Sequence, residues 1–246
     1  MAAPPLQTQS VTLAPDVSGY LAKPNGVPGI GVVVLMEAFG LNAFVKGVCN
    51  RFARAGYLAL APDLYHGDTF AYTDRERAIA RIGGVDDDVA MHEVGLALDA
   101  LTRQGAYDGR LAMIGFCMGG RLAFLANAVH GERLAASVSM YGGGIAPAVP
   151  RGSRKPLVDR AADLGAPQLL IYGALDASIA SDEHARIAKA LSDANKRYTL
   201  AVLPDAPHAF ATFDRESYHA GAAEAAWRMT FGFFVDTLMG SAAAYG

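Results

Sequence analysis

The sequence lacks most of the signals that mark a nucleic-acid-binding, membrane or secreted protein. Its 246 residues hold 21 lysines and arginines against 24 acidic residues, and no basic cluster appears, which argues against a nucleic-acid surface. No apolar run reaches the roughly 18 residues of a membrane span. The first residues show neither the basic nor the apolar segment of a signal peptide, so we expect no membrane partner and a cytoplasmic location.

Cysteine is also scarce, and the two cysteines do not form a recognisable pair. Cys49 and Cys117 show neither the spacing of metal ligands nor the pattern of a disulfide framework. We therefore expect no metal, no cofactor and a reducing compartment in which free thiols persist. The chain has no repeat, no low-complexity tract and no dividing linker, which predicts one domain over residues 1–246.

What the chain does have is a regular alternation of short apolar runs and amphipathic runs. With 52% apolar residues it can build a sizeable core. Short all-apolar runs are typical of strands that are covered on both faces, and the longer runs between them are typical of helices. This alternation predicts an α/β fold with a mostly parallel central sheet and helices on both faces.

The expected elements follow from these patterns. The predicted strands are Ser10–Thr12, Gly19–Ala22, Gly31–Met36, Tyr57–Ala61, Leu111–Ile114, Ala135–Met140, Pro167–Tyr172 and Tyr198–Leu203. The predicted helices are Ala43–Ala55, Asp87–Gln104, Met118–His130, Asp182–Ala194 and Ala220–Met239. Residues 141–166 are expected to form a long surface loop, and loops of that length often carry function.

The stretch RLAMIGFCMGGRLAFLANA places one cysteine between glycines at the junction of a predicted strand and a predicted helix. Hydrolases with a nucleophile elbow carry G-x-S-x-G at such a turn, which exposes the side chain at the top of the sheet. A helix N-terminus also favours the thiolate over the thiol. Cys117 is thus a candidate nucleophile, whereas Cys49, inside a predicted helix, is expected to be a packed core residue.

Two further reactive residues directly follow predicted strands. Asp176 comes after LLIYG, and His208 comes after YTLAVL. Ligands of open α/β sheets collect beyond the carboxyl ends of the strands, so these side chains should lie near Cys117. The chain order of nucleophile, acid and histidine is that of α/β-hydrolases. Glu37 ends another strand, at the place of the oxyanion loop in such a fold.

The other histidines have plainer interpretations. His92, His130 and His184 lie in or at the ends of predicted helices and are expected to be structural or at the surface. His219 is the rival of His208, but it does not follow a strand. His66 could line the same crevice.

Six segments together resemble the dienelactone hydrolase family, the carboxymethylenebutenolidases. They are MEAFGLN, APDLY, GFCMGG, MYGGG, YGALD and PHAF, in family order over almost the whole chain. The resemblance implies an α/β-hydrolase fold without a metal and a catalytic triad of Cys117, Asp176 and His208.

The resemblance also implies roles for residues around the triad. Glu37 would pair with the cysteine and help to generate the thiolate when substrate arrives. The backbone amides of Ala38 and Met118 would form the oxyanion hole.

The chain departs from the family where related enzymes hold a substrate carboxylate. They carry an arginine four residues beyond the triad histidine, and Thr212 stands at that position here. The segment after DLY offers Arg75, Arg77 and Arg81 without a clear register, and Arg81 is preferred because it lies nearest the next predicted helix. Arg215 is the other candidate replacement. Tyr141, in MYGGG, is a further candidate for substrate binding.

The expected reaction is the hydrolysis of an enol lactone or an activated ester through a cysteine acyl-enzyme. Ring opening of an enol lactone releases an enolate, an easy leaving group that suits a thiolate nucleophile. The expected partner is therefore a small lactone or ester from the degradation of aromatic compounds. The chain is expected to be a monomer or a weak dimer.

Three alternatives stay open at this point. Thr212 keeps a general carboxylesterase or thioesterase on the same fold under consideration. A cysteine-elbow protein of the DJ-1 or amidotransferase kind is disfavoured, because those usually place a histidine after the cysteine and Met118 stands here. A ligand-binding domain without activity is the third, since a fold does not by itself fix a function.

Overall fold

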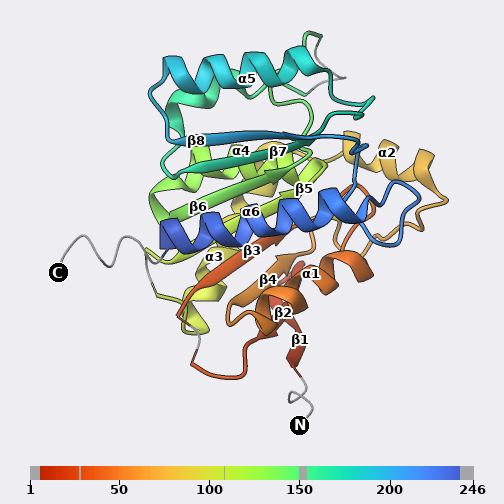
Figure 1. The fold of residues 1–246 in the computed structure, drawn as a ribbon. Helices are drawn as coiled ribbons and strands as arrows, with labels where there is room; N and C mark the ends of the chain where they lie inside the picture. The colour runs from red at the N-terminus through yellow and green to blue at the C-terminus, as the bar shows by residue number, and fades with distance from the viewer. Residues whose placement is uncertain (1–5, 28, 108, 150–153, 239–246) are drawn as a thin grey trace.

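The computed structural model describes residues 6–27, 29–107, 109–149 and 154–238, and Figure 1 shows their arrangement. The strands are β1 (Gln7–Ala14), β2 (Val17–Lys23), β3 (Gly31–Leu35), β4 (Leu58–Pro62), β5 (Leu111–Phe116), β6 (Leu134–Met140), β7 (Gln168–Gly173) and β8 (Tyr198–Leu203). The helices are α1 (Ala43–Arg54), α2 (Arg75–Gly83), α3 (Asp87–Arg103), α4 (Met118–His130), α5 (Ser181–Asp193) and α6 (Ala220–Leu238). Two short 3-10 helices are η1 (Gly131–Arg133) and η2 (Val158–Asp163).

These strands form one eight-stranded sheet in the order β1-β2-β4-β3-β5-β6-β7-β8. The pairs β1–β2 and β2–β4 are antiparallel, and every pair from β4 to β8 is parallel. All residues of β3, β4, β5 and β7 are buried, because helices cover both faces of the sheet. The predicted α/β fold with a mostly parallel sheet is confirmed.

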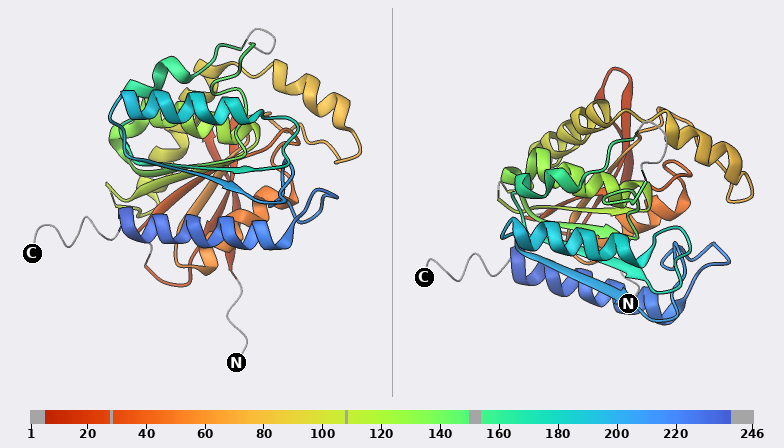
Figure 2. Two further views of the ribbon diagram at one scale, coloured as in Figure 1. Left: turned by 45° about the horizontal axis from the view of Figure 1, so that its top comes forward. Right: turned by 90° about the horizontal axis from the view of Figure 1, so that it is seen from above.

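The two faces of the sheet are covered by different helices. Figure 2 shows α1 and α6 on one side of the sheet and α3, α4 and α5 on the other. Aromatic side chains join the two helices on the first side, where Phe52 of α1 packs against Trp227 and Phe234 of α6. No helix in the described parts of the chain is long and apolar enough to cross a membrane.

All the predicted strands and helices occur, with ends shifted by a few residues at most. The predicted last residue of the C-terminal helix, Met239, lies outside the described residues. Helix α2 (Arg75–Gly83) was not predicted from the sequence. Its segment RERAIARIG is rich in charge and buries only Ala78, so it lacks the apolar stripe by which a surface helix is recognised.

The prediction for residues 141–166 was wrong in part, because the segment is not all surface. Ile145, Leu157 and Leu164 are buried, and η2 occupies Val158–Asp163. The backbone amide of Leu157 donates to the carbonyl oxygen of Ile145 at 2.7 Å, so these two buried residues are held together. Part of this segment therefore belongs to the core.

Candidate active site

Cys117 lies in the turn between β5 and α4, with φ 53° and ψ −112°. A residue with a side chain rarely adopts such angles, and they are found where the surrounding structure enforces them. A Cβ atom on Gly115 would collide with the carbonyl oxygen of Gly119, and one on Gly119 would collide with that of Leu35. Because β5, α4 and β3 approach so closely, the elbow requires glycine at both positions.

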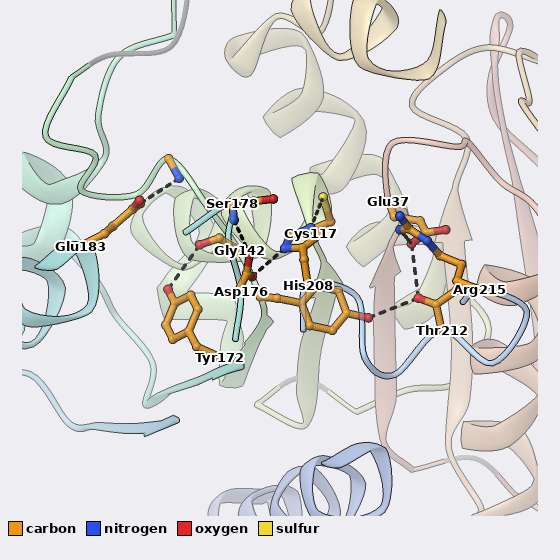
Figure 3. A network of polar contacts seen from close by, with 12 residues as sticks. Glu37, Cys117, Gly142, Tyr172, Asp176, Ser178, Glu183, His208, Thr212 and Arg215 are labelled. Carbon is orange, nitrogen blue, oxygen red and sulfur yellow. Dashed lines mark hydrogen bonds and ion pairs between the residues drawn. The ribbon is translucent and has the colours of Figure 1, made fainter. Parts of the chain in front are cut away.

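His208 lies between Cys117 and Asp176 and directs one ring nitrogen at each of them (Figure 3). The Nδ1 atom of His208 is 2.7 Å from Oδ2 of Asp176, and its Nε2 atom is 3.2 Å from the sulfur of Cys117. The other carboxylate oxygen of Asp176 accepts a hydrogen bond from the backbone amide of Ser178 at 2.8 Å. The structure thus brings together the three residues that the sequence placed after separate strands, in the order of nucleophile, base and acid.

The charge state of His208 follows from its two neighbours. Burial disfavours the imidazolium, but the negative charge of a Cys117 thiolate and the hydrogen bond to Asp176 outweigh burial and raise the pKa of His208 to about 10. At neutral pH the ring then carries both protons, one directed at Asp176 and one at the sulfur. The proton on Nε2 is then in position to stabilise negative charge on the sulfur.

Glu37 lies on the other side of Cys117 from Asp176 in Figure 3, directly beyond β3. The Thr212 hydroxyl donates to Oε2 of Glu37 at 3.4 Å, and an Nη1 atom of Arg215 is 3.7 Å from the same oxygen. Burial raises the pKa of Glu37, while Tyr72, Arg215, Asn42 and Thr212 oppose the shift.

The pairing of Glu37 with Cys117 that the family resemblance implied is not present in this structure. The sulfur of Cys117 contacts His208, and the carboxylate of Glu37 contacts Thr212 and Arg215 instead. Sequence alone could not show this, because Thr212 and Glu37 are 175 residues apart in the chain.

The two residues expected to form the oxyanion hole flank the thiol. Ala38 and Met118 line the same cavity as Cys117. Within the described part of the chain neither of their backbone amides donates a hydrogen bond to the protein, and the amide of Met118 is one of the unsatisfied donors at the start of α4. Both amides are therefore available to an oxygen atom bound beside Cys117.

A cavity of about 580 Å³ lies over the thiol. The described residues that line it are Ala38, Phe39, Arg75, Ile79, Ile82, Gly83, Cys117, Met118, Arg121, Gly143, Gly144, Pro147, Arg154, Ser178, Ile179, His208 and Arg215. None of these is acidic and four are arginines, so the cavity suits a small apolar molecule that carries negative charge. No group of three or more His, Cys, Asp or Glu side chains among the described residues could hold a metal ion.

Two of the three predicted substrate-binding residues do not line this cavity. Arg81 donates from Nε to Asp68 at 3.2 Å and stacks on the ring of Tyr65, because α2 turns Arg75, Ile79 and Ile82 toward the cavity instead. Tyr141 is fully buried behind His208, with ring centroids 5.3 Å apart, and its hydroxyl is 3.4 Å from that of Thr212. Arg215 does line the cavity.

His219, His66 and His184 each have a structural partner. The Nδ1 atom of His219 accepts a hydrogen bond from the backbone amide of Ala222 at 3.1 Å and caps the start of α6. His66 pairs with Glu93 at 2.6 Å and is not among the residues that line the cavity in the described chain. His184 stacks on Tyr172, with ring centroids 4.1 Å apart.

Cys49 is fully buried in α1, and burial raises the pKa of its thiol, as expected for a core residue. Of the cavity arginines, the sequence offered Arg75 beside Arg81 but favoured Arg81, and it did not single out Arg121 or Arg154. Arg75 begins the unpredicted helix α2, and Arg154 lies in the segment taken for surface loop. No local motif marks either residue.

Comparison with known proteins gives a consistent result. A family model described as "Dienelactone hydrolase family" matches residues 17–238. A "Putative carboxymethylenebutenolidase" of Escherichia coli O157:H7 is 36% identical over 224 residues, which cover 89% of this chain and 82% of that protein. A "Probable 2-oxo-3-(5-oxofuran-2-ylidene)propanoate lactonase" of Bradyrhizobium sp is 31% identical and covers 86% of both chains. The crystal structure titled "Putative Dienelactone Hydrolase" from Klebsiella pneumoniae has a TM-score of 0.87 and 33% identity, over 94% of this chain and 99% of that one.

Proposed function

The chain belongs to the dienelactone hydrolase family, and from this premise we propose that it hydrolyses enol lactones and activated esters through an acyl-enzyme on Cys117. One observation carries the proposal: the contacts that run from Asp176 through His208 to the sulfur of Cys117 end at the cavity. A packed core cysteine would have neither the histidine nor the open space.

In the first half of the reaction the thiolate of Cys117 attacks the carbonyl carbon of the lactone. The backbone amides of Ala38 and Met118 hold the oxyanion, and the loss of one such donor typically costs about 3–4 kcal/mol of transition-state stabilisation. The bond from the carbonyl carbon to the ring oxygen then breaks. The enolate leaves with the electron pair and takes up a proton, which the His208 imidazolium can supply.

In the second half water cleaves the thioester. His208, now neutral, accepts a proton from the attacking water, and Asp176 holds the ring in the required tautomer and orientation. The thiolate leaves, and the thiolate–imidazolium pair is restored. Proton and charge therefore balance over one cycle without a cofactor.

The identity of the nucleophile limits the substrates. A thiolate is itself a good leaving group, so the tetrahedral intermediate proceeds to products only when the leaving group of the substrate departs easily. Enolates and phenolates meet this condition, and amines of peptide bonds do not. The name of the Bradyrhizobium relative, which specifies an oxofuranylidene lactone, agrees with this substrate class.

A general carboxylesterase or thioesterase is the second candidate, because Thr212 is engaged with Glu37 and offers no positive charge to a substrate. Membership of a hydrolase family disfavours the amidotransferase-like and inactive alternatives. The proposal also includes the oligomeric state and the location: a monomer or weak dimer in the cytoplasm, where Cys49 and Cys117 stay reduced. The proposed substrates are lactones from the degradation of aromatic compounds.

The test compares wild type with Cys117→Ser, using Cys49→Ser as the matched control. We measure kcat/KM for an enol lactone, an aryl ester and an anilide, and search for the trapped acyl-enzyme by mass spectrometry. Wild type and Cys49→Ser should cleave the first two substrates and not the anilide, and Cys117→Ser should lose most of the rate. A serine variant with undiminished rate, or acylation at Cys49, would refute the proposal.

A further inference from the structure

The four arginines of the cavity differ in what neutralises them. Arg121 is buried and donates to both carboxylate oxygens of Asp87, at 2.7 and 2.8 Å. Arg215 lies beside Glu37. Arg75 is exposed at the first turn of α2, where water solvates its charge. Arg154 is half-buried and forms no ion pair with a carboxylate among the described residues, although the charge of Asp87 acts on it from a distance.

The position of Arg154 is fixed by its surroundings. An Nη2 atom of its guanidinium donates to the carbonyl oxygen of Ile82, in the last turn of α2, at 2.5 Å. The next residue is held as well, because Arg121 donates to the carbonyl oxygen of Lys155 at 3.0 Å. The cation therefore stands between α2 and the segment that follows β6, with little freedom to leave the cavity.

One donor of this guanidinium has no acceptor. The Nε atom of Arg154 is buried and has no hydrogen-bond partner among the described residues. Buried donors without a partner are rare, since losing water without gaining an acceptor is costly. Burial and the neighbouring Arg121 lower the pKa of Arg154, while Asp87, Tyr65 and Cys117 oppose the shift. The guanidinium therefore has one donor without an acceptor and a positive charge that no ion pair among the described residues neutralises.

We propose that Arg154 binds the carboxylate of an anionic enol lactone and so determines the preference of this enzyme for anionic over neutral substrates. This inference rests on the proposed function, because it places the carboxylate in the cavity where Cys117 attacks the lactone. A guanidinium fork matches a carboxylate with two parallel hydrogen bonds. Arg154 would supply the positive charge that Thr212 does not.

The test compares two enol lactones: (5-oxofuran-2-ylidene)acetate, which carries a carboxylate, and 5-methylidenefuran-2-one, which does not. In Arg154→Met, kcat/KM for the anionic lactone should fall about 10- to 100-fold, mostly through KM, and that for the neutral lactone by less than about threefold. Arg154→Lys should restore part of the loss. Arg160→Met is the control, since Arg160 is partly exposed, pairs with Asp163 and lies in the same segment.

A second measurement does not require turnover. Furan-2-acetate and furan-2-acetamide are compared as protectants of Cys117 against iodoacetamide, followed by mass spectrometry. The acetate should protect wild type and Arg160→Met at lower concentration than Arg154→Met, and the amide should not distinguish them. Protection by the acetate without lactone turnover would refute the proposed function but support the role of Arg154.

Equal losses on the two lactones, or protection by the acetate that Arg154→Met leaves unchanged, would overturn the inference. Arg154 would then only tie α2 to the segment after β6.

Discussion

The floor and the roof of the cavity are built in different ways. The floor consists of the strand ends that carry Glu37, Cys117, Asp176 and His208, and its backbones approach so closely that side chains on Gly115 and Gly119 are excluded. The roof consists of α2 and of residues 141–149 and 154–157. Helix α2 buries one residue, and among the described residues one hydrogen bond, from Arg154 to the carbonyl oxygen of Ile82, joins it to the other part of the roof. We infer that the floor determines the chemistry and the roof determines which molecule reaches it.

The largest effect should come from the floor. Asp176→Asn removes the charge that fixes the protons of His208 and should lower kcat by about 10³- to 10⁴-fold with little change in KM. Asp205→Asn, in the turn before His208, is the control and should retain activity. Steady-state kinetics on one enol lactone would measure this. A loss of less than about tenfold in Asp176→Asn would show that Asp176 has no part in the reaction.

The second prediction concerns the stability of the floor. Gly119→Ala places a methyl group against the carbonyl oxygen of Leu35 and should lower the free energy of unfolding by about 3 kcal/mol. Gly232→Ala is the matched control, because Gly232 lies in α6 with nothing within 4 Å of its added Cβ, and should raise stability by about 0.5–1 kcal/mol. Urea unfolding measures both. Equal stability of the two variants would mean that the close contact is not rigid.

A smaller effect is expected from the roof. The buried carboxylate of Glu183 accepts hydrogen bonds from the backbone amides of Gly144 and Ala146, at 2.8 and 3.1 Å. Glu183→Gln weakens these bonds, so we expect a loss of about 1 kcal/mol in stability and a KM raised a few-fold at nearly constant kcat. Asp193→Asn, exposed and paired with Lys189 in the same helix, should change neither. A fall in kcat alone would contradict the division between floor and roof.

The smallest effect is the pH dependence due to Glu37. Burial raises its pKa in the folded state above the usual 4.5, so the folded protein binds the proton more tightly than the unfolded chain. Stability from this group is present at low pH and is lost as pH rises from 4.5 through the raised value. Glu37→Gln should therefore gain stability relative to wild type as pH increases. Urea midpoints at about pH 4.5 and about pH 8 test this, and a constant difference would contradict it.

The sequence was sufficient to place the three triad residues of the floor, because the features that mark them are local. Strand ends, flanking glycines and the order of Cys117, Asp176 and His208 can all be recognised within short segments. The roof depends on contacts between distant segments, such as that of Arg154 with Ile82, which are 72 residues apart. Arg81 was chosen without knowing that α2 is a helix, and the helix turns it away from the cavity. The extent of the domain, residues 1–246, stays a prediction.

The turn at Cys117 has a consequence for how this scaffold can change. Its positive φ is set by three close-packed backbones, and nothing in that geometry depends on whether the side chain ends in sulfur or oxygen. A single Cys-to-Ser codon change can therefore replace the reacting sulfur by oxygen, while the backbone of the turn still holds the side chain in the same position. Residues of the cavity lining can change independently of this turn, so evolution can alter the substrate specificity and the nucleophile in separate steps.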